Sequence, residues 1–440
     1  MSDSQNPVKP IATRRWGFAA VAGLLGFAVA FLLAEVGLAL TGRGYNYDEP
    51  AMHFDVADPQ TGFWYKPRFQ GRWRSDHHEF DTRPTQNSAG IRGSREYPPR
   101  PEPGVFRIAL IGDSMVRGLE VEDQEVFSAL LEERLNRECS RLASSRFWPS
   151  PEAPRAVEVL NFGRSGAGAA IEASILKFKA LPFVPHLIVL FPFPNDIPED
   201  NTLLNLGHVE QIDSDGIVSR WRGIQVARPI SWFERAARRS HVVNYVFRQW
   251  RYFRHHQALK KAGGASLYFG GLFHETESDE VKRLWTATER FLTAGAALCR
   301  HEQIAFALAA LPFPPQIAAS HANYRGLNHE FRNGQIMQSA AYQNHLARFC
   351  AAGEILCFDL LLGYQAAKAA APQTRLFFDI DQHLTPAGHR VAAALLAEWI
   401  CAPAADAAAA KALAPIDRKA GTGSSFLLPA SAIATKSHLK

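Results

Sequence analysis

FRIALIGDSMVRG, residues 106–118, decides the fold of this chain. Its first half is a short apolar run rich in β-forming residues that ends in Gly112, which is typical of a buried parallel strand. Its second half contains Asp113 and Ser114 and leads to a helical pattern over residues 126–135. A strand followed closely by a helix indicates a βα unit with Ser114 in its connecting turn.

Four similar apolar runs follow further along the chain, with helical stretches between them. They are VEVLNFG (157–163), HLIVLFPFP (186–194), IAFALAALP (304–312) and EILCFDLL (354–361). Strands that alternate with helices form parallel sheets covered on both faces. The sequence therefore predicts an α/β fold: a three-layer, doubly wound, flavodoxin-like parallel sheet.

Composition limits the class of protein. At 440 residues and 47% hydrophobic content, the chain can bury one large core or two moderate ones, so overall disorder is excluded. The formal charge of +5 comes from 48 basic and 43 acidic residues spread along the chain, so no nucleic-acid partner is expected. Five cysteines without CxxC or Cys/His spacing predict no metal site, although Cys350 and Cys357 are close enough in sequence to form one disulfide.

The N-terminal segment is apolar enough to cross a membrane. Residues 16–34 carry no charge and approach the ~20 residues that a transmembrane helix needs. Lys9, Arg14 and Arg15 precede this segment, so the positive-inside tendency predicts a cytoplasmic N-terminus and an extracytoplasmic, periplasmic domain, although Arg43 weakens the asymmetry. A cleaved signal peptide and a buried core helix are the alternatives to this signal anchor.

The remaining organisation follows from changes in composition. The predicted parts are a cytoplasmic N-terminus (1–15), a transmembrane signal-anchor helix (16–41), a linker (42–104), a main α/β domain (105–402) with an insertion (about 200–285), and a disordered tail (403–440).

The insertion contains a predicted basic amphipathic helix within SWFERAARRSHVVNYVFRQWRYFRHHQALKK, residues 231–261. Its aromatic residues include Trp232, Tyr245, Phe247 and Trp250. We expect an ordinary helix whose apolar face packs on the core. A lid over the site or a surface that faces anionic lipid is the alternative.

Polar or glycine residues follow several of the predicted strands. Ser114 follows the first strand, Gly163 ends the second, and Asn195 follows the third in FPFPNDIPED. Near the end of the domain, FFDIDQHLTPAGH places His383 just before a helix that Thr385 caps. Because the carboxyl ends of parallel strands meet at one sheet edge, these residues are expected to form one site. Taken alone, the Asp-Ser pair at 113–114 indicates only a helix cap.

In these four blocks the sequence resembles the SGNH (GDSL) hydrolase superfamily over roughly residues 105–402. The blocks are GDS at 112–114, NFGxxG at 161–166, PND at 194–196 and DxHLTPAG at 381–388. The stretch QNSAGIRGSREYP at 86–98 is similar to the lead-in of membrane-anchored bacterial members.

The resemblance implies a catalytic triad with Ser114 as nucleophile and His383 as general base. It also implies an oxyanion hole drawn from Ser114, Gly163 and Asn195. The family commonly has Asp-x-x-His in its last block, but position 380 here is Ile.

The triad acid must therefore come from another position. A carboxylate is needed to hold the imidazole in its productive tautomer. Asp381 is the preferred acid and Asp379 the alternative. We expect Asp113 to brace the turn and His389 to be a surface residue without a catalytic role.

The sequence thus predicts a serine esterase that acts on acyl or acetyl esters of envelope glycan or lipid, without a cofactor. An O-acyltransferase would use the same residues. A non-catalytic, membrane-tethered protein that binds glycans, or one that binds a partner through its membrane helix and insertion, is a further alternative.

Overall fold

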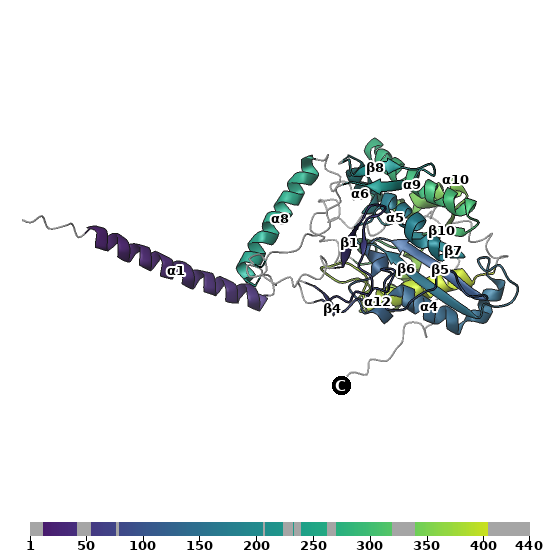
Figure 1. Ribbon diagram of the computed structural model, residues 1–440, viewed down its shortest axis with the longest axis horizontal. Coiled ribbons are helices and arrows are strands. Elements are labelled where there is room, and N and C mark those ends of the chain that lie inside the picture. Colours follow the sequence, from purple (N-terminus) through teal and green to yellow (C-terminus); the bar gives the residue numbers. More distant parts are fainter. Residues whose placement is uncertain are drawn as a thin grey trace, which may run out of the picture. The chain divides into compact units, whose positions relative to one another are not determined.

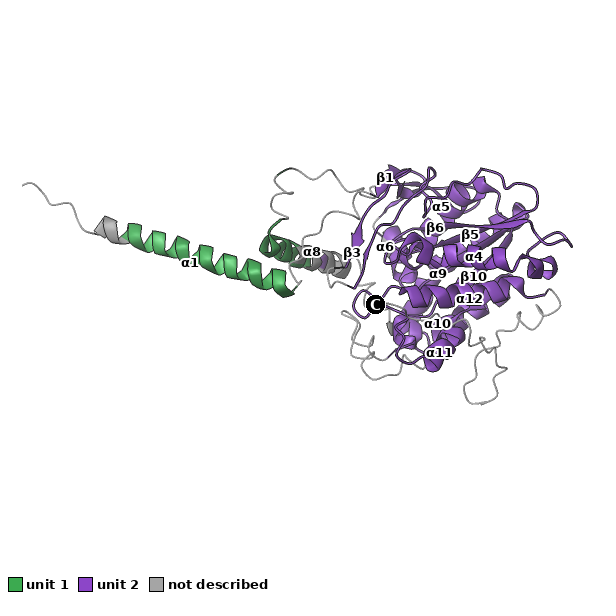
Figure 2. Cartoon of the chain, turned by 90° about the horizontal axis from the view of Figure 1, so that it is seen from below, with its two compact units in different colours: residues 1–48, 76–78, 229–256 green, residues 49–75, 79–228, 257–440 purple. Residues whose placement is uncertain are grey.

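The computed structural model describes residues 12–41, 54–75, 79–205, 207–222, 232, 239–261, 270–318 and 339–403. The chain divides into two compact units, coloured in Figure 2. Unit 1 comprises residues 1–48, 76–78 and 229–256, and unit 2 comprises residues 49–75, 79–228 and 257–440. All but the first residue of the predicted tail, and residues 1–11 of the predicted cytoplasmic N-terminus, lie outside the described residues.

Unit 2 contains a five-stranded parallel sheet. Its strands are β5 (Val105–Gly112), β6 (Ala156–Gly163), β7 (Leu187–Phe191), β10 (Ala305–Ala310) and β11 (Leu356–Asp359). They are arranged in the order β11-β10-β7-β5-β6. Numbered along the chain and counted from β6, this order is 2-1-3-4-5, which is the flavodoxin-like doubly wound order. All residues of β5 and β7 are buried, which explains their apolar sequences and confirms the predicted fold class.

Helices form the two outer layers of the sandwich. In Figure 1, α4 (Phe127–Arg137) and α12 (Pro386–Cys401) lie on one side of the sheet, and α5 (Ala169–Ile175) and α9 (Asp279–His301) lie on the other. Unit 2 also contains α3 (Ser114–Arg117), α6 (Asp196–Asn205), α10 (Ala341–Gly353) and α11 (Leu361–Ala370). Because β5 and β7 lie at the point where the strand order reverses, the carboxyl ends of these two strands form the place where such folds bind ligands.

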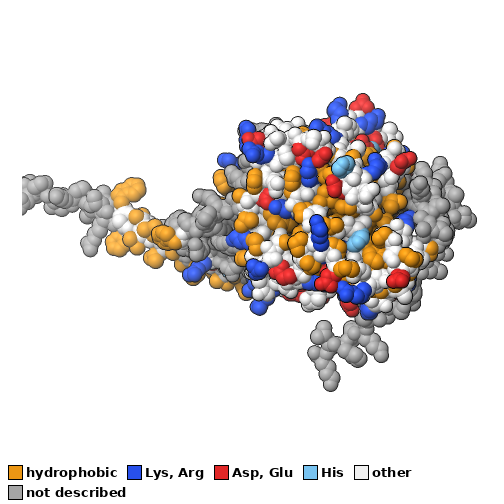
Figure 3. Space-filling view, turned by 45° about the vertical axis from the view of Figure 1, so that its right-hand side comes forward, with side chains coloured by type: hydrophobic (Ala, Val, Ile, Leu, Met, Phe, Trp, Pro, Cys, Tyr) orange, Lys and Arg blue, Asp and Glu red, His pale blue; other side chains and the backbone are white. Residues whose placement is uncertain are grey.

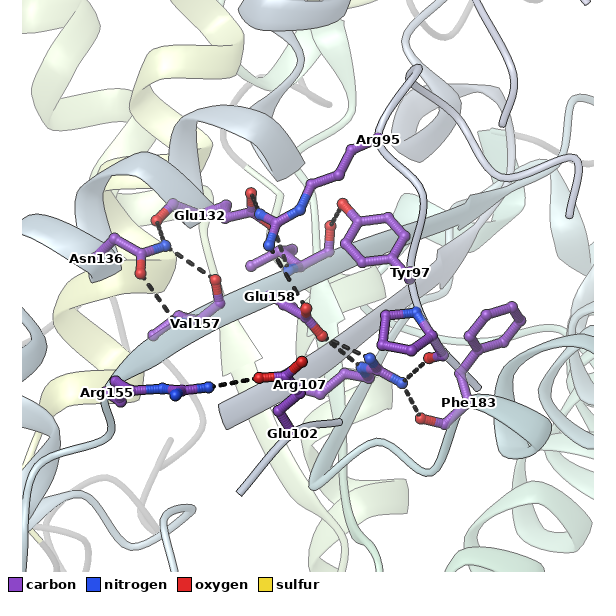
Figure 4. Close-up of polar contacts among 12 residues, drawn as sticks. Arg95, Tyr97, Glu102, Arg107, Glu132, Asn136, Arg155, Val157, Glu158 and Phe183 are labelled. Atoms are coloured by element: carbon purple, nitrogen blue, oxygen red, sulfur yellow. Dashed lines mark hydrogen bonds and ion pairs between the residues drawn. The ribbon is translucent and has the colours of Figure 1, made fainter. Parts of the chain in front are cut away.

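An ion-pair network joins β5 and β6 near their amino-terminal ends, and Figure 4 shows its contacts. Arg107 in β5 is fully buried, and its Nε lies 2.8 Å from Glu158 Oε2 in β6. The same guanidinium donates to the carbonyl oxygens of Pro98 (2.8 Å) and Phe183 (2.7 Å). A buried charge is tolerated only when it is paired and hydrogen-bonded, so this network favours the observed register of β5 against β6.

The segment predicted as a linker contains two short antiparallel pairs. One pairs β1 (Asp55–Asp58) with β2 (Gly62–Tyr65), and the other pairs β3 (Trp73–Arg74) with β4 (Asp81–Thr82). Phe54, Trp64 and Tyr65 are buried in the core of unit 2. The segment therefore packs on the domain through aromatic side chains.

Unit 1 contains the long N-terminal helix α1 (Ala12–Thr41). Over Trp16–Thr41 this helix is long and apolar enough to cross a membrane, and Figure 3 shows apolar side chains over its visible side. No part of that stretch is buried within the protein, so the reading as a core helix is wrong. Its orientation in a membrane stays a prediction.

The insertion contains a β-hairpin and a helix. The hairpin pairs β8 (Val209–Ile212) with β9 (Val218–Trp221), and α8 spans His241–Lys261. The described aromatic residues of the predicted inserted helix are exposed, and the prediction that the apolar face of this helix packs on the core stays a prediction, because most of α8 belongs to unit 1 and the core lies in unit 2. The exposed fractions of these aromatic residues are 79% for Trp232, which precedes α8, 36% for Tyr245, 50% for Phe247 and 51% for Trp250. Buried residues of the hairpin, including Ile217, Val218 and Trp221, join the core.

Candidate active site

Ser114 is the first residue of α3, directly after the end of β5. Asp113 caps this short helix, because its Oδ1 accepts a hydrogen bond from the Met115 N–H at 2.8 Å. A Cβ atom at Gly112 would lie 2.3 Å from the Val116 side chain, so only glycine allows the turn to be this tight. Asp113 therefore braces the turn, as predicted, and the turn places Ser114 at the carboxyl edge of the sheet.

Three predicted site residues lie in one hydrogen-bonded chain. His383 Nε2 lies 2.8 Å from Ser114 Oγ, and His383 Nδ1 lies 2.6 Å from Asp381 Oδ1. About a quarter of each of the His383 and Asp381 side chains is exposed to solvent, which leaves the site open to a substrate. A serine hydroxyl, an imidazole and a carboxylate in this order are the arrangement that activates a serine nucleophile.

The loop before α12 decides which aspartate reaches His383. Gln382 has a φ of +72°, and this left-handed residue allows the side chains on either side of it to meet. Glu79 anchors the loop, since its carboxylate accepts the Ile380 N–H at 3.0 Å and the Asp381 N–H at 2.8 Å. Asp379 instead forms an exposed ion pair with Arg375 at 3.0 Å.

Glu120 is a site residue that sequence reasoning missed. Its Oε1 lies 3.6 Å from His383 Nδ1 and accepts a hydrogen bond from Trp73 Nε1 at 3.2 Å. Glu120 is only 3% exposed, and burial raises the pKa of its carboxyl to about 7. Burial alone would lower the pKa of His383, but Glu120 and Asp381 together raise it above its usual value.

Within the described residues, Glu120, Asp381 and His383 also form the one group of His, Cys, Asp and Glu side chains close enough to hold a metal ion. Their nearest ligand atoms lie within 4.8 Å of one another. His383 Nδ1 already pairs with Asp381, so an ion there would compete with the hydrogen bond that orients the imidazole.

The prediction for Gly163 requires correction. Its N–H donates to Asn161 Oδ1 at 2.9 Å, so it is not available to an oxyanion. A Cβ atom at Gly163 would lie 2.3 Å from the Arg117 backbone nitrogen, so this glycine serves the close approach of α3 to β6. Asn161 completes the contact, because its Nδ2 donates to Val116 O at 2.8 Å. In the same block, Gly166 is exposed, and a Cβ atom there would meet nothing within 4 Å.

Asn195 lies at the carboxyl end of β7, immediately before α6. Its Nδ2 donates to Glu199 Oε1 at 3.3 Å and it also contacts the Asp113 carboxylate. Its buried Oδ1 has no hydrogen-bond partner among the described residues. The structure thus places Asn195 beside the turn of the nucleophile, with its amide group held by carboxylates.

A cluster of buried acids lies behind Asn195 and Asp113. Glu172, Asp196 and Asp200 are fully buried. Burial raises the pKa of Glu199 to about 8 and that of Asp200 to about 7, and it raises the pKa values of Glu172 and Asp196 well above their usual range. These carboxyls therefore keep protons in the folded protein that they lose on unfolding.

This cluster predicts that the domain becomes less stable as the pH rises from about 4 to about 8, because unfolding then releases protons. The His383 pKa, also raised, acts in the same direction above about 6.5, its usual value. His389 opposes this trend only below about 6.5, because its pKa is lowered to about 3. Thermal unfolding of the full chain in detergent should thus show a higher Tm at pH 6.5 than at pH 8.5. The Glu172→Gln variant should show a smaller difference, and a Tm that rises with pH would contradict the assignment.

His389 is not the surface residue that the sequence suggested. It is 1% exposed, and its Nδ1 accepts the Phe127 N–H at 3.2 Å, next to a stacked Phe127 ring. Burial lowers the pKa of His389 to about 3, so the ring is neutral. The residue joins α12 to the start of α4 and lies outside the Ser114 hydrogen-bond chain.

The lead-in at residues 86–98 supports the nucleophile loop. Arg92 is buried, and its guanidinium donates to the carbonyl oxygens of Arg117 (3.3 Å), Gly118 (3.2 Å) and Val121 (3.0 Å). These three carbonyls surround Glu120 in the sequence. The lead-in thus positions the loop that carries Glu120, a role that no local sequence pattern reveals.

No protein-family model matches the sequence, and no curated protein matches it. Several solved structures are similar. The acetyl xylan esterase AlAXEase shares 14% identity with a TM-score of 0.34, over 66% of this chain and 98% of its own. A variant of the acetyl xylan esterase Axe2 from Geobacillus stearothermophilus shares 11% identity with a TM-score of 0.33, over 68% and 96%. A putative lipolytic protein of the G-D-S-L family from Desulfitobacterium hafniense shares 11% identity with a TM-score of 0.31, over 67% and 99%.

The five cysteines, Cys350 and Cys357 included, are free thiols in this structure. They play no part in the Ser114 hydrogen-bond chain. In its sequence blocks, its sheet order and its Ser–His–Asp arrangement, the chain is similar to SGNH hydrolases.

Proposed function

We propose that the protein is a serine esterase that transfers the acyl group of an oxygen ester through Ser114. One observation carries the proposal: Ser114, His383 and Asp381 form a continuous hydrogen-bonded chain at the carboxyl edge of the sheet, with distances of 2.8 Å and 2.6 Å. This edge, next to the reversal of strand order between β5 and β7, is where doubly wound sheets bind ligands.

The first half of the reaction forms an acyl-enzyme. His383 Nε2 accepts the hydroxyl proton of Ser114 while Ser114 Oγ attacks the ester carbonyl carbon. The carbon–oxygen bond to the alcohol then breaks, and His383 returns the proton to the leaving oxygen. Asp381 holds the imidazole in the tautomer that leaves Nε2 free to accept, and it stabilises the transient imidazolium. In the second half, water attacks the acyl-enzyme by the same proton transfers.

The tetrahedral intermediate needs hydrogen-bond donors for its oxyanion. The N–H of Ser114 and the N–H of Gly166 have no hydrogen-bond partner among the described residues, and we propose them as donors. Asn195 would join them by turning its Nδ2 away from Glu199, to which its present hydrogen bond is long at 3.3 Å. Each well-placed donor contributes about 10² to 10³ in rate.

We propose an acylated glycan or lipid of the cell envelope as substrate. The membrane-length helix α1 and the positive charges before it support a domain held outside the cytoplasm, where such esters occur. If a sugar hydroxyl replaces water in the second step, the same residues act as an O-acyltransferase. The intact Ser114–His383–Asp381 chain disfavours a purely glycan-binding role, because binding without turnover needs no activated serine.

Turnover of p-nitrophenyl acetate by the full chain in detergent tests the proposal. We expect an initial burst of p-nitrophenol, followed by steady acetate release, and covalent labelling of Ser114 by a fluorophosphonate probe. Addition of xylo-oligosaccharide or peptidoglycan fragments separates the two outcomes, because a transferase forms O-acetylated sugar at the expense of free acetate. Absence of both turnover and labelling would overturn the enzymatic function.

A further inference from the structure

Within unit 1, a carboxylate of α1 caps the start of α8. Glu35 Oε2 accepts the His241 N–H at 2.7 Å, and its Oε1 accepts the Val242 N–H at 3.3 Å and the Ser240 hydroxyl. A helix N-terminus leaves backbone N–H groups unpaired and carries partial positive charge, so a carboxylate is its natural partner. The contact fixes the first turn of α8 at the level of Glu35 along α1.

That level coincides with the edge of a bilayer. Glu35 lies 19 residues after Trp16, and a helical rise of 1.5 Å per residue separates them by about 29 Å. The hydrocarbon core of a bilayer is about 30 Å thick. When Trp16 lies at one interface, Glu35 and the first turn of α8 therefore lie at the other.

An exposed apolar stripe runs along α8 from this point. The exposed fractions are 60% for Val246, 50% for Phe247, 51% for Trp250 and 61% for Phe253. Residues spaced three, four and seven apart share one helix face. The Arg254 guanidinium lies 5.3 Å from the Trp250 ring centroid, and the α8 sequence contains five Lys and Arg but no Asp or Glu.

The geometry points to α8 as a membrane-surface helix, with its stripe of Val246, Phe247, Trp250 and Phe253 in the outer interface of the bilayer that α1 crosses. The inference rests on the membrane anchoring proposed above. Helices that combine an exposed aromatic stripe with several basic residues and no acids lie in the headgroup region of anionic membranes. Figure 1 shows α8 running across the direction of α1 and not back along it, as a helix in the membrane plane must.

Fluorescence quenching of Trp250 tests this position in the full chain. The protein is placed in nanodiscs of phosphatidylethanolamine and phosphatidylglycerol, with either ordinary or brominated acyl chains, which quench tryptophan on contact. The emission assigned to Trp250 is the difference between the wild type and the Trp250→Phe variant. We expect this difference to lose most of its intensity in brominated discs. The corresponding difference for Trp148→Phe, a half-buried residue of unit 2, should be equal in both discs.

The Trp16→Phe variant gives the emission of Trp16 in α1, so the proposed membrane anchor and the proposed membrane-surface helix can be tested separately. Trp16 emission that is quenched, together with Trp250 emission that is not, would overturn the membrane-surface helix and leave the anchor intact. If neither emission is quenched, both the anchor and the surface helix are wrong.

Independent geometry singles out Glu120 at the active site. Its carboxylate approaches the same imidazole nitrogen that Asp381 uses, at 3.6 Å, and its Oε2 has no hydrogen-bond partner among the described residues. The charged and titratable groups that face the pair of Glu120 and His383 are Asp113, Asp381, Arg92, Arg117 and His389. Two carboxylates next to one imidazole favour its protonated form.

We infer that Glu120 is a positioning residue of the reaction: with Asp381, it holds the Nδ1 edge of His383 and stabilises the imidazolium that forms when Ser114 is deprotonated. The inference deepens the proposed function, because it concerns the base of the same site. Glu120→Gln keeps the shape of the side chain and removes its charge. The acidic limb of the kcat/KM–pH profile should then move to lower pH by about one unit or more, because a neighbouring charge shifts a pKa by about 1 to 3 units.

Trp73→Phe is a second variant that leaves Glu120 in place. Loss of the indole donor favours the neutral form of Glu120, so the limb should move in the same direction. Glu122→Gln, a change two residues away on the same segment, should leave the limb unmoved. A Glu120→Gln enzyme that is folded by circular dichroism, and whose limb stays at the wild-type pH, would overturn the role. If the wild-type protein does not hydrolyse the ester at all, the proposed function itself is overturned.

Discussion

The Ser114→Ala variant is expected to lose ester hydrolysis, with kcat falling by about 10⁴-fold or more. The alanine has no oxygen to attack the carbonyl, and the remaining donors catalyse only weakly. Ser114 is the first residue of α3 and its helix is capped by Asp113, so the substitution leaves the turn intact. Steady-state hydrolysis of p-nitrophenyl acetate by the full chain measures the effect, and circular dichroism verifies the fold.

Ser128→Ala is a matched control, because Ser128 Oγ accepts a hydrogen bond from Asn161 Nδ2 at 3.0 Å and takes no part in the hydrogen bonds that join Ser114, His383 and Asp381. We expect Ser128→Ala to lower stability while labelling of Ser114 by a fluorophosphonate persists. If Ser114→Ala hydrolysed the ester at the wild-type rate, another residue would have to be the nucleophile.

Asp381→Asn is expected to lower kcat by about 10³- to 10⁴-fold. The asparagine amide can present a donor to His383 Nδ1, which selects the wrong tautomer, and it cannot stabilise the imidazolium. Asp379→Asn should leave kcat/KM within about twofold of wild type, because among the described residues Asp379 pairs with the exposed Arg375 and not with His383. Loss of that exposed pair costs about 0 to 1 kcal/mol of stability. For both variants, kcat/KM is compared with the wild-type value at a pH above the acidic limb of the kcat/KM–pH profile.

The opposite result, a large loss in Asp379→Asn and a small loss in Asp381→Asn, would show that the loop around Gln382 rearranges when substrate binds. A small loss in both variants would instead make Glu120 the acid that orients His383. These outcomes are distinct because the three carboxylates differ in place: Asp381 lies 2.6 Å from Nδ1, Glu120 lies 3.6 Å from it, and Asp379 is bound elsewhere.

Much of the fold could be predicted, because its signals are local. A buried parallel strand such as β5 must be apolar throughout, and the turn after it must carry small or polar residues. The same reasoning found Ser114, Asn195 and His383, each next to the end of a predicted element, and identified Thr385 as the cap of α12, which its hydrogen bond to the Gly388 N–H bears out.

The errors concern residues whose surroundings come from distant segments. His389 follows a helix cap and looks like a surface residue, yet α4 covers it. Gly163 was predicted as an oxyanion donor from its sequence block, but its N–H already donates to Asn161 Oδ1. A local sequence pattern shows the type of each residue and its spacing, but it does not show which distant segment contacts that residue in the folded protein.

The sequence by itself determined the α/β class and the membrane-length helix, and it singled out Ser114 and His383 as the candidate nucleophile and base, since each of these depends on a short run of residues and its immediate neighbours. Only the tertiary structure decided between Asp379 and Asp381, because the choice depends on the left-handed Gln382 and on Glu79, which lies about 300 positions away. It also brought Glu120 to His383 from a loop that Arg92 holds. Charges act through space over a few ångströms, so the electrostatics of the site were set by folding and not by sequence spacing.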